Sequence, residues 1–359
     1  MNSYKMTINH DIQGLFKIIL KGNSYPSFNY GPIFSLFRDI CIIIYESNKV
    51  LKKDGAITDN LSLINNITEI RHKVKTNQGM KNKDIFHNLL EGHRSIFGND
   101  IDNIGFYIDG QVLASSTLFP SFVFAGTPLQ NFSDKENFMS IVTKIGKITS
   151  EINQIINESI LLTSNPLLPP QQESYILKDV WDQRFFTKEV TYNVFITRLL
   201  LIQNELTTCV WLKHHLDYDS PDLNLDKYIL LRLISIKLHE TMRNLLDIKQ
   251  RFKEYWNSLE NMDFTIDFYK NTIEDEVKTL RDMLHYNNDG VNFFDYLQQK
   301  IKGDSRYSDI LIDTMFDNFI YTIRESISNK IDIHSYDSMS DTEKISRRIQ
   351  SLAQNNVQY

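Results

Sequence analysis

The sequence is short of turn-forming residues and of cysteine. Its 359 residues include 13 glycines and 8 prolines, so long apolar periodic runs are rarely interrupted, which favours helices joined by short loops. The two cysteines, Cys41 and Cys209, each lie inside an apolar run, which excludes a disulfide framework and is typical of a reducing cytoplasm. No apolar run approaches the roughly 20 residues that a membrane span needs, and no apolar signal segment follows Met1. We therefore expect a cytoplasmic protein that does not enter a membrane.

An excess of basic charge is also absent. The formal net charge is −6, whereas a protein that coats nucleic acid is usually basic. This argues against a high-affinity, sequence-independent nucleic-acid binder, and less against an enzyme that touches RNA at one pocket. Hydrophobic residues make up 42% of the chain, which is enough to bury cores and excludes global disorder.

Apolar residues recur at helical spacing along most of the chain, so the predicted fold class is all-α. We expect one or two helices within about 11–53, one within 61–74 and one within 136–163. Five more are expected at about 187–216, 225–255, 264–286, from 293 onward, and 309–329. Residues 98–135 are rich in glycine and phenylalanine, and there the Asp109-Gly110 pair predicts either a small hairpin or an irregular loop.

A proline-rich stretch at 165–172 is the clearest helix breaker in the chain. Pro166, Pro169 and Pro170 fall within it, and proline lacks the N–H that a helix interior needs. We therefore predict two helical domains, one over 1–164 that carries the insertion at 98–135 and one over 172–330. A polar tail would follow over 331–359, with one short amphipathic helix at 342–353.

The segment Leu280-Arg281-Asp282-Met283-Leu284-His285-Tyr286 combines two groups that can cleave RNA without a metal. On a continuous helix, Arg281 and His285 share a face because they are four residues apart. A guanidinium stabilises the charge that develops on phosphate oxygens, and an imidazole moves protons near neutral pH. The 2′-hydroxyl of RNA would then attack the adjacent phosphorus.

This helix-ending motif resembles that of the HEPN superfamily of helical nucleases and nucleotide-binding domains, over about residues 187–300. The resemblance implies a helical bundle that dimerises across a shared RNA cleft, and an RNase of the phage-defence or toxin type. It assigns phosphate binding to Arg281 and acid–base catalysis to His285, with Asp282 or Tyr286 orienting them. Three residues separate Arg281 from His285, one fewer than the tightest family spacing, which would place His at Tyr286.

Other residues extend or compete with this interpretation. Lys278, His239 and Arg243 are candidate RNA contacts, because Lys278 precedes Arg281 on the expected helix and the other two are four residues apart on another. The competing hypothesis is a non-catalytic helical module that binds a protein or nucleotide, because an arginine and a histidine near a helix C-terminus also simply complement the helix dipole. A regulatory protein partner is an open alternative.

Metal and cofactor chemistry have weaker signals. The segment from His87 through Glu91 to His93 offers three possible metal ligands, but without the spacing of a known zinc motif. The sequence contains no phosphate-binding Gly-rich loop, no dinucleotide fingerprint and no nucleophile elbow. We therefore expect neither a metal nor a cofactor, and RNA is the expected substrate.

Overall fold

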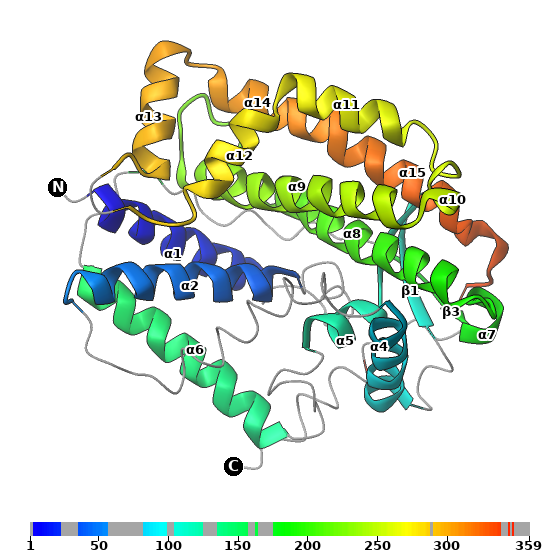
Figure 1. The fold of residues 1–359 in the computed structure, drawn as a ribbon. Coiled ribbons are helices and arrows are strands. Elements are labelled where there is room, and N and C mark those ends of the chain that lie inside the picture. The colour runs from blue at the N-terminus through cyan, green and yellow to red at the C-terminus, as the bar shows by residue number, and fades with distance from the viewer. Residues whose placement is uncertain are drawn as a thin grey trace.

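The computed structural model describes residues 3–22, 35–56, 82–98, 104–124, 135–156, 162–163, 175–287 and 290–338, together with Lys344 and Arg347. Two long helices, α8 (Val190–His215) and α9 (Leu225–Arg251), lie side by side through the centre (Figure 1). The Asn224 side chain caps α9 by accepting a hydrogen bond of 2.7 Å from the Lys227 amide. The mostly helical architecture confirms the coarse prediction from the sequence.

Three helices form a layer beside this central pair. They are α1 (Ser3–Gly22), α2 (Ser35–Lys53) and α6 (Lys135–Ile156), and each contacts the other two. α1 also packs on α9, and α2 on α8 (Figure 1). These elements confirm the helices expected within 11–53 and 136–163, while the stripe at 61–74 falls outside the described residues.

The C-terminal helices cover the other side of α9 (Figure 1). Their order is α10 (Lys253–Trp256), α11 (Met262–Thr272), α12 (Glu274–Asp282), α13 (Phe293–Gly303), α14 (Tyr307–Met315), the π-helical turn η3 (Phe316–Ile320) and α15 (Tyr321–Ile331). The short η4 (Ile333–Ser335) follows. One helix was expected over 264–286, and this is wrong, because the chain breaks at Ile273 and α12 ends at Asp282. Three acidic residues in the first turn of α12 favour a helix start there.

A three-stranded antiparallel sheet departs from the all-α prediction. Its order is β2 (Val112–Ser116), β1 (Ile104–Asp109), β3 (Ile176–Val180). β1 and β2 form a hairpin in which Gly110 has φ of +59°, a conformation that glycine adopts without strain. The hairpin alternative is therefore confirmed, whereas β3 was not predicted. Helices α4 (Asn82–Phe97), α5 (Leu118–Phe124) and α7 (Asp182–Phe185) complete this region.

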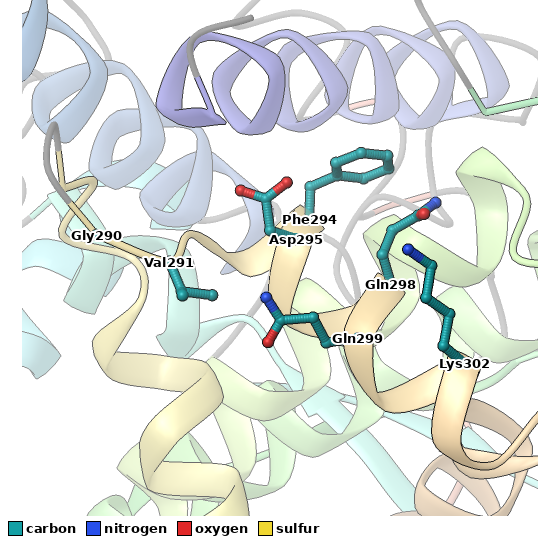
Figure 2. A pocket seen from close by; sticks show the side chains of 7 residues that line it. All are labelled: Gly290, Val291, Phe294, Asp295, Gln298, Gln299 and Lys302. Carbon is teal, nitrogen blue, oxygen red and sulfur yellow. The ribbon is translucent and has the colours of Figure 1, made fainter.

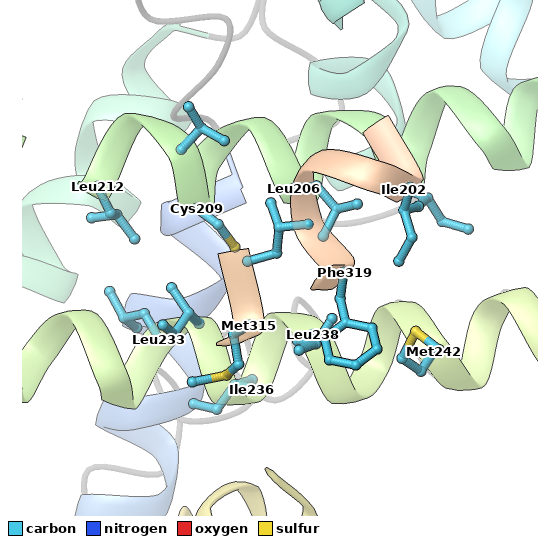
Figure 3. Packing of buried hydrophobic residues seen from close by; sticks show 14 of the residues in the cluster. Ile202, Leu206, Cys209, Leu212, Leu233, Ile236, Leu238, Met242, Met315 and Phe319 are labelled. Atoms are coloured by element: carbon cyan, nitrogen blue, oxygen red, sulfur yellow. The ribbon is translucent and has the colours of Figure 1, made fainter. Parts of the chain in front are cut away.

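The largest hydrophobic cluster joins both halves of the chain. It includes Met6 and Leu15 of α1 together with apolar residues of α8, α9 and the C-terminal helices. Figure 3 shows its centre, where Leu206 and Cys209 of α8 face Met315 and Phe319. The proposed domain boundary at 165–172 lies outside the described residues, so the two-domain division stays a prediction, but the packed core continues across it.

No helix in the described ranges is long and apolar enough to cross a bilayer.

Candidate functional site

Arg281 lies at the edge of the α9–α12 interface. The buried residues Val277 and Leu280 anchor α12, which packs against α9. The Arg281 Nη2 and Nε lie 2.8 Å and 3.2 Å from Oε1 of Glu240 on α9, and its Nη1 lies 3.0 Å from Oδ1 of Asp282. The side chain is 14% exposed. Two carboxylates therefore hold the guanidinium in one orientation.

The electrostatic environment keeps this guanidinium charged. Burial alone would lower the pKa of Arg281, but Glu240 and Asp282 outweigh that effect and raise the pKa. Asp282 itself is exposed and contacts Arg281 as an orienting residue would.

His285 lies beyond the end of α12 and has a different partner. Its amide bonds the Asp282 carbonyl at 3.1 Å, which is a tight turn and no longer an α-helical bond. Its Nδ1 lies 3.1 Å from Oε2 of Glu46 on α2, and its side chain is 42% exposed while Glu46 is buried. The expectation that Arg281 and His285 share one face of a continuous helix is wrong, because each group is held by a carboxylate from a different helix.

Tyr286 is part of the scaffold. Its hydroxyl donates to Oδ2 of Asp11 on α1 at 2.6 Å, and the same carboxylate accepts from Arg232 at 2.9 Å and from Tyr228 at 2.7 Å. All four side chains are buried, and burial with the nearby Asp11 carboxylate raises the pKa of Tyr286 well above its usual value. The structure therefore gives Tyr286 a role in fixing the segment after α12 and no contact with Arg281.

A second imidazole lies in the electrostatic range of Arg281. His239 of α9 is 8% exposed, and its Nδ1 is buried without a hydrogen-bond partner. Burial lowers its pKa, and Arg281 and Arg243 add to that effect while Glu240 and Asp282 oppose it. Arg243 and Lys278 are both exposed. The predicted RNA contact His239 thus lies within the electrostatic range of both Arg281 and Arg243, and its lowered pKa favours the neutral imidazole.

A group of four charges joins three helices, and Glu240 acts electrostatically on one of them, Arg38. Glu205 of α8 forms two contacts with Arg38 of α2, of 2.6 Å and 2.8 Å, and one of 2.7 Å with Lys237 of α9. Lys237 also lies 2.6 Å from Asp39. Burial would raise the pKa of Glu205, but Arg38 and Lys237 outweigh it and lower the pKa. This neutral group ties α2, α8 and α9 together under the candidate site.

The sequence had not pointed to the carboxylates that organise the site, Glu240, Glu46 and Asp11. The sequence does contain a signal for the cations that pair with buried carboxylates, because α9 carries Arg232 and Lys237 inside a nearly continuous apolar run. A cation in such a run must be paired when it is buried. The signal identifies the cation but not which carboxylate meets it.

The structure does not bring His87, Glu91 and His93 together as a metal site. His87 and Glu91 are exposed and lie 3.0 Å apart, whereas His93 is buried with its Nε2 2.6 Å from Oγ1 of Thr117. Among the residues that the structure describes, no group of three or more acidic, histidine or cysteine side chains could hold a metal ion.

A surface cavity of about 410 Å³ lies beside α13, away from these residues (Figure 2). Its lining comprises Gly290, Val291, Phe294, Asp295, Gln298, Gln299 and Lys302. Phe294 stacks on His10 at 4.5 Å and Asp295 accepts a hydrogen bond from Ser3, so both side chains are already engaged with α1. The cavity therefore offers a ligand mainly two carboxamides and one ammonium, and none of the candidate residues.

Comparison of the chain with protein-family models, curated proteins and solved structures gave no match.

Proposed function

We propose that the chain is a metal-independent endoribonuclease of the HEPN type, with residues 172–330 as its helical bundle and the α9–α12 face as its site. The observation that carries the proposal is the grouping of an oriented guanidinium, Arg281, with a neutral imidazole, His239, and a second cation, Arg243. The role is that of a phage-defence or toxin effector acting on RNA.

The chemistry requires few groups. Three of the five N–H donors of Arg281 contact carboxylates, which leaves donors for two phosphate oxygens. The 2′-hydroxyl of the substrate attacks the adjacent phosphorus while a neutral imidazole takes its proton. The bond from phosphorus to the 5′-oxygen breaks, which leaves a 2′,3′-cyclic phosphate and a 5′-hydroxyl that receives a proton from a second acid. Arg281 stabilises the charge on the phosphate oxygens in the transition state.

A homodimer would supply the second acid. The two histidines of one chain have different surroundings. His239 lies in the electrostatic range of Arg281 and Arg243, whereas His285 contacts the Glu46 carboxylate. Two copies facing each other across the α9–α12 face would place an imidazole on either side of one phosphodiester. The dimer is therefore part of the proposal.

The second candidate is a non-catalytic module that binds a protein or nucleotide. It is favoured by the two carboxylates, Glu240 and Asp282, which already take three of the N–H donors of Arg281 and balance its charge. Acidic groups beside a cation weaken its attraction for RNA phosphate.

The test is cleavage of an RNA with all four bases by the purified protein in EDTA. We expect cleavage by the wild type, and losses of about 10²- to 10³-fold in Arg281→Ala. Whichever of His239→Ala and His285→Ala removes the general base should lose about 10²- to 10⁴-fold. Lys147→Ala, an exposed lysine on α6, is the matched control and should cleave like the wild type.

The outcomes separate the two candidates. If no RNA is cleaved by any protein while all variants unfold at similar temperatures, the binding module replaces the enzyme. If cleavage survives in Arg281→Ala and in both histidine variants, the activity lies elsewhere and the site assignment fails.

A further inference from the structure

Lys213 lies among three aromatic rings at the C-terminal end of α8. Its Nζ is 4.5 Å from the ring centre of Phe316, 5.6 Å from that of Tyr321 and 5.8 Å from that of Tyr218. All three distances are within the range of about 6 Å at which a cation is attracted to a ring face. We call these three rings the aromatic cage.

The π-helical turn η3 builds one wall of the cage. The amide of Tyr321 donates to the carbonyl of Phe316, five residues earlier, which widens the helix by one residue at this turn. Residues five apart therefore lie in line, and the rings of Phe316 and Tyr321 are 5.7 Å apart at an angle of 44°. In a regular α-helix such residues do not face each other. Turns of this type are frequent at functional sites.

The base of the cage is buried and its rim is open. Phe316 is fully buried, whereas Tyr218, Tyr321 and Lys213 are partly exposed. A ligand could therefore reach the rings if the Lys213 side chain turned outward into water. Such a movement is easy for a lysine, whose long stem has several rotatable bonds.

The charges around the cage favour a cation. Burial together with the carboxylates of Asp219, Asp313 and Asp317 raises the pKa of Tyr218 to about 12, and all three carboxylates are exposed. The cation Arg324 also acts electrostatically on Tyr321, but it lies 3.9 Å from the carboxylate of Asp109. The contacts that the structure gives the Lys213 ammonium are those with the three rings.

We propose that the aromatic cage is a binding site for a small methylated ammonium ion, and that Lys213 occupies it when no ligand is bound. A primary ammonium is strongly hydrated, whereas a trimethylammonium group is bulky and weakly hydrated, and aromatic cages recognise such ions through their ring faces. The three carboxylates at the rim would draw the cation toward the rings. This site is separate from the α9–α12 face and does not depend on the ribonuclease proposal.

The test is titration with choline, followed by calorimetry or by the NMR signals of the protein. Lys213→Ala removes the internal competitor, so we expect it to bind choline roughly 3- to 30-fold more tightly than the wild type does. The matched ligand is 3,3-dimethylbutan-1-ol, which has the shape of choline without its charge and should bind far more weakly. Lys147→Ala should behave like the wild type.

A second substitution tests the rings directly. Lys213→Ala combined with Tyr218→Leu should lose most of the gain, because leucine fills space without a ring face. If Lys213→Ala binds choline no better than the neutral analogue, the cage only stabilises Lys213 and the proposal fails. Lys213→Gln, which is neutral and retains part of the stem, takes its place if the alanine variant does not fold.

Discussion

At the scale of the residue, His93 shows how strongly burial can change the chemistry of one side chain. It is 2% exposed, and its Nε2 contacts the Thr117 hydroxyl, whose oxygen also accepts from the Gly105 amide. Burial lowers the pKa of His93 to about 3, with Asp182 opposing and Arg94 adding to the shift. The imidazole is therefore neutral in the folded protein throughout the mildly acidic range.

This shift predicts a loss of stability in acid. Above pH 6.5, His93 is neutral in the folded and unfolded chains and contributes no pH dependence. Between pH 6.5 and about 3 the unfolded chain takes up a proton that the folded chain refuses, so the free energy of unfolding falls by up to about 1.4 kcal/mol per pH unit. Compared with the wild type, His93→Gln should lose about 2 kcal/mol less between pH 7 and pH 5, as measured by urea unfolding.

The control is Gly146→Ala on α6, which changes no titratable side chain, so the pH dependence of its free energy of unfolding should match that of the wild type. Equal losses for His93→Gln and the wild type would contradict the assignment to His93.

The sequence could predict which residues are chemically capable of a role, but not which residues they contact. The motif at 280–286 identified Arg281 as a candidate cation, but its partner Glu240 lies 41 residues earlier in the chain. The pairing depends on the packing of α12 on α9, which no local pattern encodes. Tyr286 was expected, as an alternative to Asp282, to orient Arg281 and His285, but its hydroxyl donates to Asp11, 275 residues away.

At the scale of the element, α1 and α9 approach each other closely at Gly14. A Cβ placed on Gly14 would lie 2.7 Å from Cβ of Ile229. The missing side chain therefore lets α1 lie against α9, and this brings Asp11 within reach of Arg232.

Gly14→Ala should destabilise the protein in spite of the better helix propensity of alanine. Overpacking costs about 1–3 kcal/mol, whereas the propensity gain is at most about 1 kcal/mol. Gly146→Ala in α6 is the matched control, because no described residue outside its own helical turn comes within 4 Å of a Cβ placed there, and it should stabilise by about 0.5–1 kcal/mol. Both values can be measured by denaturant unfolding. Recovery of Gly14→Ala by Ile229→Ala would confirm the contact, and a stable Gly14→Ala would refute it.

Elements with strong apolar periodicity were predictable, and those without it were not. The periodic runs predicted α8 and α9 close to their observed bounds, and the single helix expected over 309–329 corresponds to α14, η3 and α15 in succession. The break at Ile273 was not predicted because the apolar periodicity continues through it. The three acidic residues that begin α12 could have indicated a new helix start there. β3 is five residues long, and its partners are a strand some 70 residues earlier and a bridge from Lys178 to Ser338, so its formation depends on tertiary contacts.

At the scale of the whole molecule, the C-terminal helices depend on α1. Arg232 is fully buried, and its ion pair with Asp11 is made across the two halves of the chain. The hydrophobic cluster also passes from α1 into α9. Removing α1 would expose this cluster and leave a buried guanidinium without its carboxylate.

A fragment of residues 172–338 is therefore expected not to fold by itself. An unpaired buried charge costs about 3–5 kcal/mol, a large part of the 5–15 kcal/mol that typically stabilises a domain. We expect poorly dispersed amide NMR signals and no cooperative thermal transition, whereas the full chain should unfold cooperatively. A sharp transition in the fragment would show that the bundle is an autonomous domain, as the proline-rich stretch at 165–172 suggests.

The pairing of Asp11 with Arg232 also has a consequence for synthesis. The two residues are 221 positions apart, and ribosomes add about 5–20 residues per second. The carboxylate on α1 is therefore synthesised roughly 10 to 40 seconds before its guanidinium partner. During that interval the apolar face of α1 that will cover α9 has no final neighbour, so the nascent chain should be a client for chaperones that bind exposed hydrophobic helices.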